Sequence, residues 1–153
     1  MSARCVLILL LVLFISMSTV MSGQRPAPIR YAAADTMPAN VVQRFVDAAN
    51  VRDANAMSEL VSEDVVFARF PDGRVFVQGR DSIRAYYSRQ LRSVPAEFYI
   101  TVDPRVVEGQ LVIDQEHFAG MPPGRRQATW MYLVRNGLIR RAWVLDGRPP
   151  PAQ

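Results

Sequence analysis

The chain of 153 residues contains no lysine, a single histidine and a single cysteine. The cysteine, Cys5, stands at the extreme amino terminus, so a chain processed beyond it has no disulfide, thiol nucleophile or cysteine-based metal site. His117 has no second histidine or cysteine with which to share a metal ion. These absences predict no metal and no cofactor, and they leave stability to an ordinary apolar core in a single domain.

Because lysine is absent, positive charge comes from arginine alone, and the formal net charge is +4. The arginines are scattered along the chain, apart from the pairs Arg125-Arg126 and Arg140-Arg141. A nucleic-acid-binding protein would concentrate its basic residues in a stripe and usually carry a recognisable module. The pattern instead favours a solvated surface, so nucleic acid is not expected as a partner.

The amino terminus has the pattern of a signal peptide. Residues Met1 to Arg4 are short and positively charged, and Cys5 to Met21 form an almost unbroken apolar run. We expect residues 1–23 to be removed on export, which gives a periplasmic or secreted protein with no stable membrane association. The alternative is an uncleaved membrane anchor, although the run is at the short end of the ~20 residues that span a bilayer.

Composition divides the rest of the chain into three parts. Residues 24–37 are rich in proline and alanine and predict a flexible linker, and residues 147–153 form a proline-rich tail. Residues 38–146 between them form the predicted domain.

Three helices are predicted. Pro38–Asn50 is amphipathic, since its apolar residues recur at i, i+3 and i+4. Asp53 can cap a shorter helix that runs through Val61, and Asp81 can cap a third helix at Ser82–Leu91. The apolar residues of the first helix are Val41, Val42, Phe45, Val46 and Ala49.

Strands occupy the remaining positions. Val65–Phe70 and Val75–Val77 form a short hairpin, and Glu97–Glu108 is a long strand in which Pro104 indicates a bulge or an edge position. The sequence then alternates through three further strands, 111–118, 127–134 and 138–145.

Asn136-Gly137 separates the last two strands, and this pair is typical of a type I′ hairpin. Helices followed by antiparallel strands predict an α+β domain, a curved antiparallel sheet wrapped around three N-terminal helices. Such a sheet leaves a cone-shaped pocket between its layers, which is a default ligand site.

Several segments together resemble the SnoaL-like and ketosteroid-isomerase-like branch of the nuclear-transport-factor-2-like superfamily. They are Arg44-Phe45, Leu60–Phe67, Gly79–Tyr87 and the closing Tyr132–Ile139 region, and the resemblance spans residues 38–146. It implies a cystatin-like cone and a homodimer formed through the sheet, where Trp143 would face outward. The superfamily includes isomerases, cyclases, dehydratases, hydrolases and non-enzymatic binders, so the fold does not decide the activity.

The isomerase mechanism needs a carboxylate base and an oxyanion hole made by a tyrosine and a protonated aspartic acid. By the resemblance, the tyrosine position falls on Phe45, the base on Arg69 and the aspartic acid on Trp130. None of these side chains can perform the corresponding step. Arginine stays protonated at neutral pH and cannot act as a base. Phenylalanine has no hydroxyl group to donate, and tryptophan is not an acid. The resemblance therefore does not extend to this mechanism.

Strand parity predicts a different pair of acids. Even-numbered positions from 112 to 118 should face the helices, which places Asp114 and Glu116 side by side in the cone and raises at least one pKa. They could act as general acid and base or neutralise Arg69. A one-residue slip would instead turn Gln115 and His117 inward, with the histidine as a possible base. The expected ligand-binding residues are Phe45, Arg69, Tyr86, Val112, Phe118, Trp130 and Tyr132.

Three functions remain open at this stage. The first is binding of a small, partly apolar molecule without catalysis. The second is a cofactor-independent isomerase, lyase or hydrolase that uses Asp114 or Glu116. The third is an interaction module that uses its outer sheet face, for which the pocket should be collapsed or filled by side chains.

Overall fold

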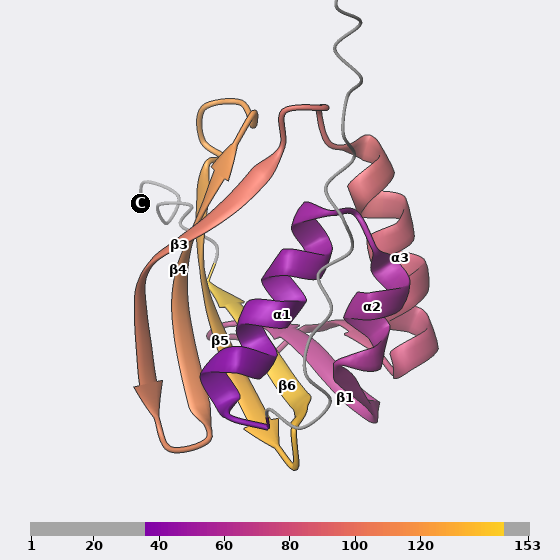
Figure 1. Ribbon diagram of the computed structural model, residues 1–153, viewed down its shortest axis with the longest axis vertical. Coiled ribbons are helices and arrows are strands. Elements are labelled where there is room, and N and C mark those ends of the chain that lie inside the picture. Colours follow the sequence, from indigo (N-terminus) through magenta and orange to yellow (C-terminus); the bar gives the residue numbers. More distant parts are fainter. Residues whose placement is uncertain (1–35, 146–153) are drawn as a thin grey trace, which may run out of the picture. The chain divides into compact units, whose positions relative to one another are not determined.

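The computed structural model describes residues 36–145, and Figure 1 shows their arrangement. The predicted signal peptide, the linker up to residue 35 and the tail lie outside these residues, so export stays a prediction. Within the described part, no helix is long and apolar enough to cross a membrane. The elements are α1 (Pro38–Asn50), α2 (Ala54–Glu59), β1 (Val61–Arg69), β2 (Val75–Gln78), α3 (Arg80–Ser93), β3 (Tyr99–Glu108), β4 (Leu111–Ala119), β5 (Gln127–Arg135) and β6 (Leu138–Leu145).

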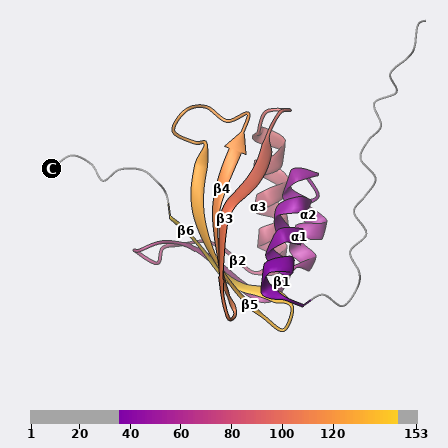
Figure 2. The ribbon, with the colours of Figure 1, turned by 60° about the vertical axis from the view of Figure 1, so that its left-hand side comes forward.

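The strands form one curved sheet with the order β2-β1-β6-β5-β4-β3. Neighbouring strands are antiparallel except β1 and β6, which run parallel. The three helices lie on one face of the sheet, as Figure 2 shows. The predicted α+β architecture is therefore confirmed.

Two local predictions from turn and strand chemistry are also confirmed. Asn136 and Gly137 have φ of 54° and 71°, the left-handed values that a type I′ turn requires. Pro104 lies on β3 at the edge of the sheet, and the β3–β4 register shifts between Val102 and Arg105. Proline has no backbone N–H to donate to the hydrogen-bond ladder of a sheet. The edge position and the bulge together accommodate it.

The boundaries of two predicted helices are wrong, and β1 and β3 begin at Val61 and Tyr99 rather than at Val65 and Glu97. The second helix ends at Glu59, and Val61 begins β1, where it pairs with Ile139. Tertiary pairing of a β-branched residue therefore overrides the helical spacing. The third helix begins at Arg80 rather than Ser82, because Gly79 is its N-cap and accepts the first backbone hydrogen bond from Ile83.

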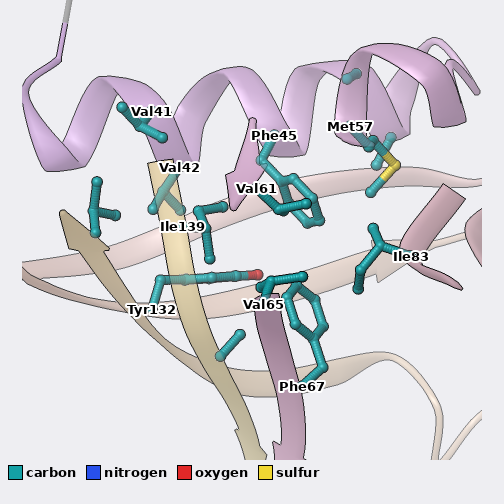
Figure 3. Close-up of a cluster of buried hydrophobic side chains, with 14 of the residues drawn as sticks. Val41, Val42, Phe45, Met57, Val61, Val65, Phe67, Ile83, Tyr132 and Ile139 are labelled. Carbon is teal, nitrogen blue, oxygen red and sulfur yellow. The ribbon is translucent and has the colours of Figure 1, made fainter. Parts of the chain in front are cut away.

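The core lies between α1 and the concave face of the sheet (Figure 3). Val42 and Phe45 of α1 face Tyr132 and Ile139 of the sheet, and all four are at most 3% exposed. Burying each of these side chains stabilises the fold by roughly 1.5–3 kcal/mol before entropy is subtracted. This packing fixes the helix across the sheet and so defines one wall of the site.

Asn50 fastens the carboxyl end of α1 to the edge strand β3. Its side-chain amide donates to the Ile100 carbonyl at 2.9 Å, and its Oδ1 accepts from the Ile100 N–H at 2.7 Å. The asparagine thereby completes the hydrogen bonds of an edge residue that has no neighbouring strand on that side.

The outer face of the sheet carries an apolar row. Val106, Ile113, Met131 and Trp143 are cross-strand partners on β3, β4, β5 and β6. Trp143 lies on this face and Trp130 on the concave face, as strand parity predicts. Homodimerisation through the outer face stays a prediction, and sedimentation velocity of the purified protein tests it.

Candidate functional site

A cavity of about 600 Å³ opens between the helices and the concave face of the sheet. Its walls come from α1, α2, α3 and strands β1, β3, β4 and β5, together with the β4–β5 loop. The interaction-module hypothesis expects a collapsed pocket or one filled by side chains. This domain instead has an open cavity. The volume is within the range of small-molecule sites.

The parity prediction for β4 is confirmed. Val112 and Asp114 are fully buried and Glu116 is 4% exposed, whereas His117 is exposed. The imidazole Nε2 of His117 lies 3.0 Å from the Asp103 carbonyl oxygen, away from the cavity. A role for this histidine inside the cone is therefore excluded by its position.

Asp114 forms a bidentate ion pair with Arg105 of β3. The guanidinium Nε and Nη2 donate to the two carboxylate oxygens, each at 2.7 Å. The prediction of Arg69 as partner is wrong, because Arg105 is the cross-strand neighbour of Asp114 after the register shift in β3. Asp114 does not line the cavity, so its carboxylate is committed to this structural pair.

Arg105 also holds the first turns of α1. Its Nη1 donates to the Ala39 carbonyl at 3.2 Å and to Gln43 Oε1 at 2.9 Å. The Gln43 amide in turn donates to Asp47 at 2.8 Å. One guanidinium thus joins β3, β4 and α1, and its geometry provides the extra hydrogen bonds that a buried ion pair needs.

Glu116 is the acid that reaches the cavity. The Tyr132 hydroxyl donates to its Oε1 at 2.8 Å, and no other described residue hydrogen-bonds the carboxyl group. Burial, together with the nearby charge of Asp114, raises the pKa of Glu116 to about 8 against the opposing effects of the Tyr132 hydrogen bond and the Arg105 charge. At neutral pH the group is largely protonated. Because Oε1 accepts from Tyr132, Oε2 carries the proton and remains available to an occupant of the cavity.

Tyr87 of α3 supplies a second polar atom. Its ring packs edge-on against Phe45, with centroids 5.6 Å apart, and no described residue hydrogen-bonds its hydroxyl. Burial raises the pKa of Tyr87 well above its usual value, and the charge of Glu116 adds to the effect. Tyr87 is therefore a neutral phenol in the same cavity as Glu116, able to donate a hydrogen bond.

Seven aromatic side chains line the cavity. Trp130 and Tyr132 stack with centroids 5.8 Å apart and an interplanar angle of 15°. Phe98 and Phe118 stack at 6.0 Å and 22°. Flat, parallel ring faces on two sides suit a flat apolar occupant.

Most of the predicted lining is found, with Asp114 and Val112 as the two exceptions. Val112 is buried in the core beside Tyr132 and does not reach the cavity. The predicted residues that do line it are Phe45, Arg69, Tyr86, Glu116, Phe118, Trp130 and Tyr132.

Sequence reasoning missed other lining residues. Phe98 precedes β3, and Arg125 and Arg126 lie in the β4–β5 loop, where no periodic pattern indicates which side chains face a cavity. The adjacent arginines are visible in the sequence as a pair, but nothing there places them at the pocket. In residues 36–145, no group of three or more His, Cys, Asp or Glu side chains could hold a metal ion.

Comparisons with solved structures identify similar folds. A cystatin-fold protein from Novosphingobium aromaticivorans is 16% identical and covers 70% of this chain and 96% of its own, with a TM-score of 0.62. A putative polyketide cyclase from Sinorhizobium meliloti is 21% identical, with coverage of 69% and 93% and a TM-score of 0.58. A putative ketosteroid isomerase from Kribbella flavida is 19% identical, with coverage of 75% and 83% and a TM-score of 0.54.

No match was found among curated protein sequences. The family profile described as the SnoaL-like domain matches residues 42–142, which is most of the chain and nearly all of the described part. The chain belongs to the SnoaL-like domain family, and its fold is similar to those of cystatin-fold and NTF2-like structures.

Proposed function

We propose that this domain binds a small, partly apolar molecule in its cavity and holds one polar atom of that molecule with Glu116. The observation that carries the proposal is a single buried acid at an aromatic cavity, with one oxygen fixed by Tyr132 and the other without a hydrogen-bond partner within residues 36–145. A ligand acceptor that takes a hydrogen bond from the protonated Glu116 gains free energy, since hydrogen bonds are stronger in a site shielded from water.

The fold neighbours support the same class of ligand. Two of them are described as a putative polyketide cyclase and a putative ketosteroid isomerase, and polyketides and ketosteroids are apolar compounds with carbonyl groups. A protonated Glu116 and the neutral phenol of Tyr87 are both hydrogen-bond donors, and a carbonyl oxygen accepts two hydrogen bonds. A flat compound with a carbonyl or hydroxyl group therefore fits both the walls and the polar atoms.

Filling the cavity tests the proposal. We expect Ala128→Trp, on the cavity wall, to weaken binding of the fluorescent neutral probe N-phenyl-1-naphthylamine by about tenfold or more, since an indole takes the space of the probe's ring system. The matched control is Thr101→Trp at an exposed position of β3, which should leave the dissociation constant unchanged. Equal affinity in wild type and Ala128→Trp, or no binding by the wild-type protein, contradicts the proposal.

A second function, proton-transfer catalysis without a cofactor, is favoured by the pKa of about 8 at Glu116. An acid whose pKa lies near the working pH is suited to general acid-base chemistry. In its carboxylate form, Glu116 would take a proton from the carbon beside a ligand carbonyl. The C–H bond breaks, an O–H bond forms on Oε2, and the electron pair moves to the carbonyl oxygen, where the Tyr87 hydroxyl can donate.

Deuterium exchange detects this chemistry without knowledge of the natural substrate. With 2-tetralone in D₂O, we expect NMR to show catalysed exchange of the protons beside the carbonyl. The rate should rise with pH through a midpoint near 8, the pKa of Glu116, because the carboxylate is the base. Glu116→Gln should abolish the catalysed rate. An equal rate in the variant, or no catalysis by the wild type, leaves binding alone as the function.

A further inference from the structure

Charge is distributed unevenly over the cavity. Three of its lining residues are arginines, Arg69, Arg125 and Arg126, which we call the arginine rim. The acidic residue among the lining side chains is Glu116, which is buried and hydrogen-bonded to Tyr132. Since burial also keeps this acid largely protonated at neutral pH, it does not neutralise the rim. The charged side chains that line the cavity are therefore mainly arginines.

The two parts of the arginine rim lie at the same end of the concave face. Arg69 ends β1 and pairs with Val144, which also pairs with Trp130 of β5, so Arg69 and Trp130 share one row of the sheet. The β4–β5 loop that carries Arg125 and Arg126 leads directly into the start of β5. The chain thus places all three arginines at the end of the cavity where the β4–β5 loop lies.

Contacts hold two of these side chains near the opening. The Arg126 Nε donates to the Met121 carbonyl at 3.2 Å, within its own loop. The Arg69 guanidinium lies 5.9 Å from the centroid of the Phe76 ring. The Arg126 contact uses one edge of its guanidinium group, whose planar fork presents further N–H donors. Low-dielectric aromatic walls strengthen the attraction of such a rim for an anion.

We propose that the ligand of this cavity is an organic anion: an apolar ring system held between the aromatic walls, with one carboxylate, sulfonate or similar group at the arginine rim. This inference rests on the proposed binding function and adds the charge of the ligand to it. The ring system lies along the stacked faces of Trp130 and Tyr132, and the anionic group accepts hydrogen bonds from the guanidinium groups. A neutral compound of the same shape gains nothing from the arginine rim and binds more weakly.

Two fluorescent probes isolate the contribution of the anionic group. 8-Anilinonaphthalene-1-sulfonate and N-phenyl-1-naphthylamine share one ring system, and only the first carries a sulfonate. We expect the sulfonate probe to bind the wild-type protein about tenfold more tightly, and this preference to shrink as salt is raised from low to high concentration. The double variant Arg125→Gln/Arg126→Gln should weaken binding of the sulfonate probe about tenfold and leave binding of the neutral probe within twofold.

The matched control removes the same two charges elsewhere. Arg135 and Arg140 are exposed, at the β5–β6 hairpin end of the sheet, and Arg135→Gln/Arg140→Gln should leave both affinities unchanged. Equal affinity for the two probes, or equal loss in both double variants, overturns the inference while the proposed function stands. If neither probe binds the wild-type protein, or if the Ala128→Trp variant binds both probes as tightly as the wild type does, the proposed function itself fails. The inference then fails with it.

Discussion

Replacing Arg105 with methionine should lower the free energy of unfolding by about 3–5 kcal/mol. The carboxylate of Asp114 is fully buried, and both of its oxygens are hydrogen-bonded by this guanidinium. Without Arg105, the charge stays in the core with no partner, and α1 loses its bonds at Ala39 and Gln43. Urea denaturation followed by circular dichroism measures the loss, which is a large part of the total stability of a small domain.

The control for this variant is an exposed ion pair of similar length. Arg84 and Asp81 of α3 are 2.8 Å apart, with side chains 51% and 88% exposed, so Arg84→Met should cost at most about 0.5 kcal/mol. If Arg105→Met fails to fold, the double variant Arg105→Met/Asp114→Leu should recover a folded domain, because it removes the unpaired charge. Equal destabilisation by Arg105→Met and Arg84→Met would contradict a structural role for the buried pair.

Glu116→Gln should remove a fall in stability that the wild-type protein shows between about pH 5 and pH 8. The pKa of Glu116 is raised from 4.5 to about 8 on folding. Below pH 4.5 the carboxyl group is protonated in both the folded and the unfolded protein. As pH rises toward 8, the unfolded chain releases it first, so stability is lost at up to about 1.4 kcal/mol per pH unit. Glutamine cannot ionise and still accepts from Tyr132, so the variant should be more stable at pH 9 by roughly 5 kcal/mol.

Subtracting the two unfolding curves isolates this residue, since every other titrating group is shared. Glu108→Gln, at an exposed position on β3, should give no comparable difference at any pH. A difference between wild type and Glu116→Gln that stays constant from pH 5 to pH 9 would mean that the carboxyl group does not change its proton affinity on folding.

Local chemistry in the sequence accounts for much of the fold. Asn136-Gly137 specifies the last hairpin because both residues must adopt positive φ. Alternation along β4 places Glu116 inside and His117 outside, because the side-chain period of a strand is two. The boundary at Val61 was missed, since its apolar side chain fits a helix or a strand equally well and only its pairing with Ile139 decides between them.

The site was less predictable than the fold. The pairing of Asp114 with Arg105 depends on a register shift beside Pro104, and a sequence does not specify where a bulge resets its register. The hydrogen bond from Tyr132 to Glu116 is not between cross-strand partners, because Tyr132 pairs with Val112. Its formation depends on the curvature of the sheet and the direction of the tyrosine ring.

The titration of the Glu116 side chain tests the central claim most directly. With ¹³C-labelled glutamate, NMR follows the carboxyl carbon of each residue against pH, and Glu116→Gln assigns the signal by its absence. A midpoint near pH 8, raised further in Tyr132→Phe because the hydrogen bond lowers the pKa, is the predicted result. A midpoint near 4.5 would show a solvated, ionised carboxylate and would contradict a neutral acid facing the cavity.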